Sequence, residues 1–363
     1  MRTGNCVVVF VWLLAGPPPD VTYAATDEER VQYLLAGARD ARERLLSAVV
    51  HASGTFFTDQ RESAPFEGPL RYSIAFDYTT SRFRFDRDKP ARREREGGLE
   101  VFQYSTKQVE LQDYVIAWGS LHENADFHRL DAENWQKYPG EAFDVRTLGM
   151  SSGIALKKRR GIAKTCEGFL TRPIESVDEV PGGLTKISLL SPPEAGVRVV
   201  LWINEGEGFT PVRQEVWEAE FSMEGQPIPG KWRPQPSILT EMTWKQVGED
   251  WVPATWLMEE RGRASLERHQ LTFDWQYVNQ KVPEEYFTLE GMKIDPDHDM
   301  IDYRLGSPIS LGSVRDVIVG KPSDAADEPP ASWTSRGITV AVMVLVGLLF
   351  AFFVSRTGGK KRA

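Results

Sequence analysis

Apolar residues occupy every second position along many short segments of this 363-residue chain. One run extends from Tyr72 to Tyr78, and Phe83 and Phe85 continue the alternation after a short polar turn. Side chains of a strand point to opposite faces in turn, so this pattern predicts an antiparallel hairpin. Residues 184–190 with 197–203, and 240–246 with 251–259, predict further hairpins. We therefore expect a mainly antiparallel β fold with a few helices (α+β), as a large curved sheet or a half-open β-barrel covered by helices.

Two segments show helical spacing instead. Thr26 and Glu29 form a capping-box pattern, and apolar residues then recur three or four positions apart from Val31 onward. A second helix is predicted over residues 156–170, ended by Pro173. Residues 92–98 are charged and residues 225–236 are rich in proline, so both are predicted to be loops.

The C-terminal region contains a long apolar stretch. Residues 337–355 carry no charge, and as a helix they would reach about 28 Å, close to the hydrocarbon thickness of a bilayer. Five basic residues and no acid lie between residue 336 and the end, which favours a cytoplasmic tail at 356–363. We predict a transmembrane helix at 337–355 after a flexible stalk at 321–336. A sorting signal that is later removed would show the same order of segments.

The N-terminal region has the order of a signal peptide. Arg2 precedes an apolar run from Cys6 to Ala15, three prolines follow, and Ala24 is a small residue near a cleavage point. We predict a signal peptide at 1–25, with an uncleaved anchor as the alternative. Residues 26–320 then form a periplasmic or extracellular domain, and the chain is a single-pass membrane protein with its C-terminus in the cytoplasm.

Charge and cysteine content narrow the function classes. The net charge is −9, and the basic tail makes the predicted ectodomain more acidic still, which argues against nucleic acid as a partner. Cys6 and Cys166 are the two cysteines of the chain. Loss of the signal peptide leaves Cys166 alone, so the predicted domain holds no internal disulfide and depends on its apolar core.

Tryptophan is concentrated in the second half of the chain, next to a strand that is apolar on both faces. In that strand Leu201 and Ile203 alternate with Val200 and Trp202. Such a strand is either covered on both sides or lines a cavity. If a cavity is present, we expect a ligand site formed by five residues: Trp202, Trp217, Trp244, Trp256 and Trp275.

Catalytic and metal motifs are missing from the sequence. None of the five histidines has metal-ligand spacing, and there is no nucleophile elbow, phosphate-binding loop or paired-cysteine motif. Residues 295–299 alternate aspartates, which would suit calcium, but an acidic turn is the simpler interpretation. We predict a protein without enzymatic activity, metal or cofactor. A hydrolase would require two convergent carboxylates of raised pKa in a cleft.

The order of segments resembles the LolA-like superfamily of periplasmic lipoprotein carriers. The resemblance covers residues 27–310 and includes Ser53-Gly54-Thr55-Phe56-Phe57, Leu201-Trp202-Ile203-Asn204, Trp251-Val252-Pro253 and Ile301-Asp302-Tyr303-Arg304. It implies a half-open sheet covered by helices that shelters acyl chains. The predicted anchor departs from the soluble carriers and argues against shuttling. We therefore expect a membrane-tethered module that binds a lipid or an acylated partner. The alternative is a structural or protein-interaction ectodomain without a ligand cavity, for example an envelope-stress or assembly component.

Overall fold

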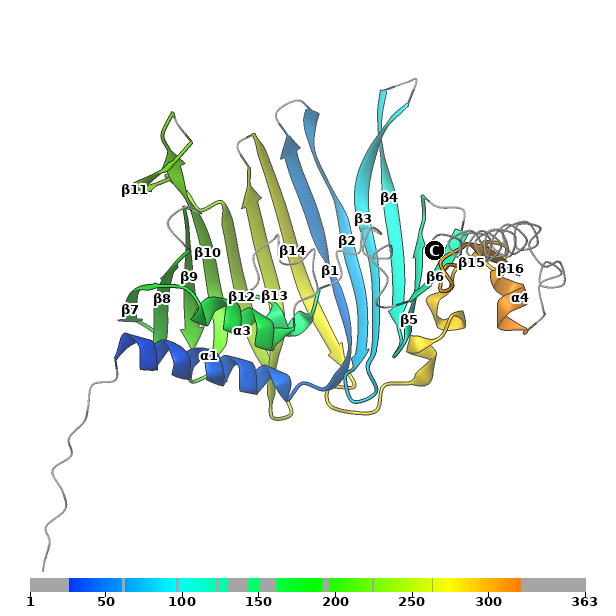
Figure 1. Cartoon of the computed structure of the whole chain (residues 1–363), viewed down its shortest axis with the longest axis horizontal. Coiled ribbons are helices and arrows are strands. Elements are labelled where there is room, and N and C mark those ends of the chain that lie inside the picture. The colour runs from blue at the N-terminus through cyan, green and yellow to red at the C-terminus, as the bar shows by residue number, and fades with distance from the viewer. Residues whose placement is uncertain are drawn as a thin grey trace, which may run out of the picture.

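A computed structural model describes residues 26–320 apart from 61–62, 96–97, 122–123, 130–142, 151–160, 192–195, 224 and 263. Its strands form one large, open, curved sheet in the order β16-β15-β6-β5-β4-β3-β2-β1-β14-β13-β12-β10-β9-β8-β7, and β11 pairs with β10 alone (Figure 1). All neighbouring strands are antiparallel except β15 and β6. The predicted fold class is therefore confirmed as an open sheet, with β7 and β16 at its edges.

The strands are β1 (Ser47–Gln60), β2 (Ser63–Asp77), β3 (Arg82–Arg95), β4 (Gly98–Glu110), β5 (Tyr114–Gly119), β6 (Asn124–Arg129), β7 (Ile174–Val180), β8 (Leu184–Leu190), β9 (Val197–Asn204), β10 (Thr210–Phe221), β11 (Pro227–Trp232), β12 (Ile238–Val247), β13 (Asp250–Arg261), β14 (Ser265–Gln276), β15 (Asp299–Asp302) and β16 (Ile309–Ser313). The helices are α1 (Asp27–Glu43), α3 (Ile162–Leu170) and α4 (Val314–Ile318), with short 3-10 helices η2 (Val145–Thr147), η4 (Glu284–Phe287) and η5 (Glu290–Met292).

Helix α1 begins where the sequence predicts. The Thr26 side chain accepts a hydrogen bond from the Glu29 amide, and the Glu29 side chain accepts one from the Thr26 amide. This reciprocal cap satisfies two amides that the first helical turn would leave without partners. The apolar stripe of α1 is buried, with Leu34 and Leu35 inaccessible to solvent. The second predicted helix is present as α3, and residues 156–160 of that prediction lie outside the described residues.

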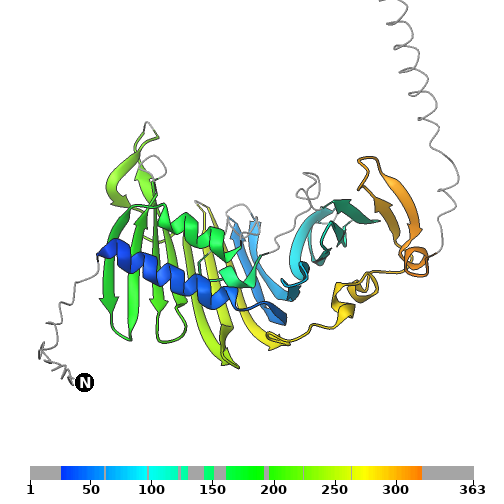
Figure 2. The same ribbon diagram turned by 60° about the horizontal axis from the view of Figure 1, so that its bottom comes forward.

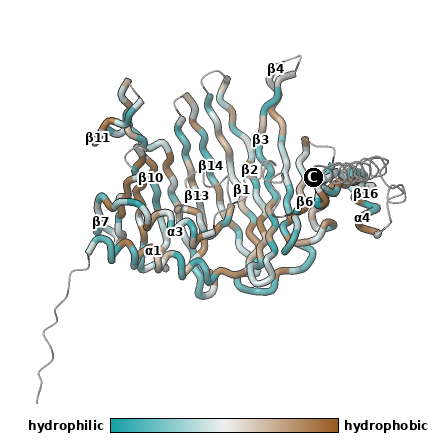
Figure 3. The backbone as a smooth tube through the Cα atoms, in the orientation of Figure 1, coloured by the Kyte–Doolittle hydropathy of each residue, from teal (hydrophilic) through white to brown (hydrophobic). Residues whose placement is uncertain are grey.

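The sheet has two distinct faces. We call the face under α1 and α3 the helix face; it carries the larger apolar core, which includes Val50, Ala52 and Phe85. We call the other the reverse face; its smaller core includes Val49 and Ala75. Successive residues of one strand belong to different cores, as strand geometry requires. Figure 2 shows α1 and α3 lying across one side of the sheet, and Figure 3 shows hydrophobic and hydrophilic residues alternating along the central strands.

The chain returns to the reverse face after β14. Residues 282–300 leave the lower ends of the central strands in Figure 1, contact β3 and β4 through η4 and η5, and lead to β15. Val282, Phe287 and Met292 from this segment pack into the smaller core against Val49 and Val109. β15 then pairs in parallel with β6, so strand pairing fixes the C-terminal end of this segment and packing in the smaller core fixes the rest. It forms one wall of the site described below.

Two predicted loops are wrong. β3 continues to Arg95 and β4 begins at Gly98, so most of residues 92–98 belong to a long hairpin. Opposed side chains across this hairpin include Arg93 and Glu100, whose Nε and Oε2 lie 2.9 Å apart, so charge in the segment supports strand pairing. Residues 225–236 contain β11, which pairs with β10 despite its prolines because it lies at an edge.

The predicted terminal segments lie outside the described residues. These are the signal peptide (1–25), the stalk (321–336), the transmembrane helix (337–355) and the basic tail (356–363). Within the part of the chain that the structure describes, no helix has both the length and the apolar character needed to cross a membrane.

Candidate polar site on the reverse face

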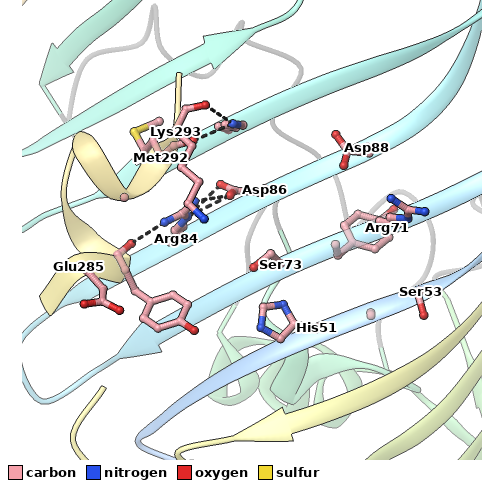
Figure 4. A pocket seen from close by; sticks show the side chains of 15 residues that line it. His51, Ser53, Arg71, Ser73, Arg84, Asp86, Asp88, Glu285, Met292 and Lys293 are labelled. Atoms are coloured by element: carbon pink, nitrogen blue, oxygen red, sulfur yellow. Dashed lines mark hydrogen bonds and ion pairs between the residues drawn. The ribbon is translucent and has the colours of Figure 1, made fainter. Parts of the chain in front are cut away.

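A cavity of about 640 Å³, lined mostly by polar and charged residues, opens on the reverse face between the sheet and the returning segment (Figure 4). Pockets for small ligands commonly have volumes of about 300–1,000 Å³. Its lining comprises His51, Ala52, Ser53, Arg71, Tyr72, Ser73, Arg84, Asp86, Asp88, Lys107, Glu285, Tyr286, Gly291, Met292 and Lys293. Strands β1 to β4 supply the floor, and the η4–η5 segment supplies the wall.

Strand register brings the floor residues together. His51 pairs with Ser73, Ser73 with Asp86, and Asp86 with Lys107, which forms one row across four strands. Directly paired residues place their Cβ atoms about 4.5–5.5 Å apart, within reach of polar side chains. His51 and Ser73 lie between residues of the helix-face core, and Asp86 follows Phe85 of that core, so the apolar half of these three strands fixes the direction of the polar half.

A second row lies two residues farther along the strands. Ser53 pairs with Arg71, Arg71 with Asp88, and Asp88 with Ser105. The Ser105 hydroxyl donates to Asp88 Oδ1 at 2.5 Å, so that carboxylate has a partner inside the sheet. Figure 4 shows Ser53, Arg71 and Asp88 at the end of the cavity away from the 3-10 helices.

Arg84 and Asp86 form a close charge pair in the floor of the site. The Arg84 Nε lies 3.0 Å from Asp86 Oδ2 and its Nη2 lies 2.5 Å from the same oxygen. Arg84 Nη1 also donates to the Tyr286 carbonyl at 3.2 Å. Burial raises the pKa of Asp86, and the hydrogen bonds and charge of Arg84 offset part of that rise. The pair thus neutralises the floor of the pocket and ties it to η4.

Lys107 connects the floor to η5. Its Nζ donates to the carbonyls of Met292 and Lys293 at 2.7 and 2.9 Å. Burial lowers the pKa of this ammonium group, while the nearby Asp86 charge raises it. Gly291 is required in the same wall, since a Cβ at that position would lie 1.7 Å from the Glu285 carbonyl oxygen. The wall therefore has a fixed position relative to the floor.

The five tryptophans predicted to bind ligand are not brought together. Trp256 and Trp275 are buried in the helix-face core, and Trp244 packs against it. Trp202 and Trp217 extend from the reverse face, because their strand neighbours Leu201, Ile203 and Val216 belong to the helix-face core. None of the five lines the polar cavity.

The indole groups also have internal partners. Trp244 and Trp275 donate to the carbonyls of Pro211 and Pro253 at 2.9 and 2.7 Å. Trp217 donates to Glu215 Oε2 at 2.8 Å. The tryptophans thus take part in core packing on the helix face and in pairs on the reverse face, and their role in ligand binding stays a prediction.

Among the described residues, the acidic side chains considered for a metal site or for hydrolysis have partners within the protein. No group of three histidine, cysteine or acidic side chains is placed to hold a metal ion there. The acidic run 295–299 forms a turn in which Asp295 Oδ1 accepts from the Asp297 amide at 3.0 Å, and Asp297 pairs with Arg315 at 2.8 Å. Within the pocket, the carboxylate with a raised pKa, Asp86, is engaged by Arg84.

Sequence reasoning missed the pocket residues because they form the polar half of ordinary alternating strands. His51, Ser73 and Asp86 follow the pattern of side chains that face solvent. The one local signal is the density of charge over residues 84–88, where Arg84, Asp86 and Asp88 share a face. That signal does not show which strands lie beside it.

Known proteins that are similar to this chain were found among solved structures. Neither the protein-family models nor the curated protein sequences include a match to this chain. Among solved structures, a LolA superfamily protein from Nitrosomonas europaea is 14% identical with a TM-score of 0.36, and the match covers 71% of this chain and 97% of that chain. A DUF1329 family protein from Desulfovibrio piger is 10% identical with a TM-score of 0.34, covering 72% and 99%.

A third similar structure is LprF from Mycobacterium bovis, at 14% identity and a TM-score of 0.24, with 68% of this chain and 93% of that chain covered. All three TM-scores are below 0.5, and no property of these proteins is carried over to the pocket residues described above. The chain is similar in structure to LolA-like proteins, as its sequence predicts.

Proposed function

We propose that this chain is a membrane-tethered, extracytoplasmic binding module without catalytic activity, and that it holds a polar ligand in the reverse-face pocket. The single observation that carries the proposal is the pocket itself: a charged cavity with a floor on four paired strands and a wall fixed by Lys107 and Arg84. Sites built on paired strands hold their side chains in defined positions, which favours selective binding.

The tight packing of the helix face favours the reverse face as the ligand site. Apolar side chains of α1 pack there against those of the sheet, and Leu34, Leu35 and Leu201 are fully buried. An acyl chain on this face would compete with α1 for the same contacts. A lipid ligand would then enter with its head group in the reverse-face pocket, and its chains would remain outside.

Native mass spectrometry of the full chain, released from membranes in an uncharged detergent, tests this proposal. We expect a bound small molecule that is lost in a Ser73→Trp variant, because the indole would occupy the cavity. Thr243→Trp is the matched control, since Thr243 is exposed on β12 outside the lining. A bound molecule that survives Ser73→Trp, or no bound molecule in either protein, would refute the pocket as the site.

A protein-interaction ectodomain remains the second candidate. It is favoured by aromatic and cationic side chains that meet on the reverse face of β8–β10. The Arg213 guanidinium lies 5.3 Å from the Trp202 ring, and that of Arg198 lies 5.3 Å from the Trp217 ring. Tryptophan and arginine are enriched at protein interfaces. A photo-crosslinker at position 202 should capture a defined protein in intact cells if this function applies, and a crosslinker at position 113 should not.

A further inference from the structure

The charged groups of the pocket divide into those with internal partners and those without. Arg84 and Asp86 pair with each other, Lys107 donates to two backbone carbonyls, and Asp88 accepts from Ser105. Each of these groups has at least one partner in the protein itself. Ligand recognition is then left mainly to the other polar side chains of the lining.

Arg71 is a cation of the floor whose side chain has no hydrogen-bond or ion-pair partner among the described residues. It is exposed at the pocket. Ser53 is its direct partner across β1 and β2, and Ser73 follows two residues later on the same face. That spacing is about 6.7 Å along a strand. One cation and two hydroxyl groups therefore occupy neighbouring positions on the same face, with His51 beside Ser73.

The sign and number of these donors indicate the class of ligand. A guanidinium forms paired hydrogen bonds to the oxygens of carboxylates and phosphates. A carboxylate offers two oxygens, which Arg71 alone would occupy. A phosphate ester has four oxygens, three of them terminal in a monoester and two in a diester, so that a further terminal or ester oxygen remains for the hydroxyls of Ser53 and Ser73. The donor set thus matches a phosphate better than a carboxylate.

The acids of the lining add a second requirement. Asp88 faces the same end of the pocket as Arg71, and Glu285 is exposed on the wall. An all-anionic ligand would be repelled by these carboxylates, whereas hydroxyl groups would donate to them. A ligand whose phosphate is flanked by hydroxyl groups satisfies both sets, because hydroxyls beside the phosphate would donate to Asp88 and more distant ones to Glu285.

We infer that the pocket recognises a hydroxyl-bearing phosphate ester, with its phosphate on Arg71, Ser53 and Ser73. The inference rests on the proposed binding function and specifies its ligand. A free sugar or glycerol phosphate and the head group of a phospholipid share this chemistry. The binding step forms hydrogen bonds and an ion pair, and no covalent bond changes.

Calorimetry of the full chain in uncharged detergent distinguishes these sources. sn-Glycerol 3-phosphate, inorganic phosphate and glycerol are the soluble probes. The lipid probes are vesicles of phosphatidylcholine that contain phosphatidylglycerol and vesicles of phosphatidylcholine alone. The full chain is reconstituted into these vesicles, or added to them from detergent, at the same total lipid concentration. We expect glycerol phosphate or phosphatidylglycerol to bind at least tenfold more tightly than glycerol or phosphatidylcholine. Binding of glycerol phosphate identifies a free phosphate ester as the ligand, and binding of phosphatidylglycerol identifies a phospholipid head group.

Substitution of Arg71 tests the assignment of the phosphate. Arg71→Gln should weaken binding of the preferred probe about tenfold or more, since a charge-assisted pair is lost. Arg71→Lys should give an intermediate loss, because it keeps the charge and loses the paired geometry. Arg44→Gln is the matched control: Arg44 is exposed at the end of α1, and its replacement should leave affinity within about twofold. Unchanged melting temperatures would show that each variant is folded.

The failures of the two proposals are distinguishable. If a molecule bound in wild type is displaced by Ser73→Trp but has no phosphate, or if Arg71→Gln binds the phosphate probe as tightly as wild type, phosphate recognition is wrong and the pocket stands. If no phosphate probe binds and Ser73→Trp removes no bound molecule, the phosphate inference and the proposed function both fail.

Discussion

The Lys107 ammonium group of β4 donates to the carbonyl of Met292, 185 positions later in the chain, at 2.7 Å. The same Nζ reaches the Lys293 carbonyl, so one side chain caps the end of η5 and holds it against the sheet. Hydrogen bonds from a charged donor are among the stronger side-chain interactions, and these two join the wall of the pocket to its floor.

Replacement of Lys107 by methionine keeps most of the apolar stem and removes the donor. We expect the free energy of unfolding to fall by about 1–3 kcal/mol, because two carbonyls lose a charged partner. Chemical denaturation measures the change. Lys164→Met is the control, since Lys164 is exposed on α3, and it should change stability by about 0.5 kcal/mol or less. Equal effects of the two variants would show that Lys107 does not hold the wall.

A methyl group at position 291 should be poorly tolerated. The Gly291→Ala Cβ would meet the Glu285 carbonyl oxygen at 1.7 Å, and backbone atoms cannot move aside as a flexible side chain does. We expect a loss of about 1–3 kcal/mol, as for other overpacked sites. Gly168→Ala is the matched control in α3, where nothing lies within 4 Å, and there the change should stabilise by about 0.5–1 kcal/mol. Thermal melts of both variants would reveal the opposite signs.

The β2–β3 turn should make stability depend on pH. Burial of Asp77 raises its pKa, but hydrogen bonds from Thr79, Thr80 and Arg82 outweigh that effect and hold the pKa below its usual value. The folded protein therefore binds fewer protons at Asp77 than the unfolded chain. Asp77 therefore contributes to the free energy of unfolding at pH values above its pKa in the unfolded chain, which is about 4. That contribution is lost as the pH falls through the pKa of Asp77 in the folded protein.

Asp77→Asn should accordingly destabilise the protein at pH 7 by about 1–2 kcal/mol, since hydrogen bonds to a charged acceptor are lost. The difference from wild type should shrink as the pH is lowered below about 4, where Asp77 itself becomes protonated. Urea titrations at several pH values would show this convergence. Asp113→Asn, at an exposed turn, should give no such pH-dependent difference.

Replacing a tryptophan should lower the free energy of unfolding by an amount that depends on the face of the sheet where it lies. Trp256 is 3% exposed and lies in the helix-face core, so Trp256→Ala should cost about 3–5 kcal/mol. Trp202 is half-buried on the reverse face, and Trp202→Ala should cost about 1 kcal/mol. Denaturation curves compare the two. A similar large loss for both would contradict the assignment of Trp202 to a solvent-facing surface.

The single cysteine of the described domain should be unreactive while the domain is folded. Burial raises the pKa of the Cys166 thiol to about 11, and the neighbouring Arg42 charge offsets part of the rise. About one thiol in a thousand is then ionised at pH 8, and the side chain is 3% exposed. In a Cys6→Ser background, a disulfide reagent should label Cys166 only after denaturant is added. Rapid labelling of the native protein would contradict this environment.

Local patterns in the sequence were enough to predict the elements. Period-two alternation gave the β2–β3, β8–β9 and β12–β13 hairpins, and the Thr26–Glu29 box gave the start of α1, because strand pleat and helix capping depend on residues a few positions apart. Charge and proline content misled at residues 92–98 and 225–236. There, pairing with a neighbouring strand prevailed over local preference.

The tertiary structure alone decided the site. A polar residue on an alternating strand looks the same whether it faces water or a pocket. The register of β1 to β4 and the return of residues 282–300 over them place Arg71, Ser73 and Asp86 in one cavity with Met292. The same long-range packing puts Trp256 in the core and leaves Trp202 on the reverse face. Contacts between residues some 200 positions apart depend on how the whole sheet pairs, which no short pattern encodes.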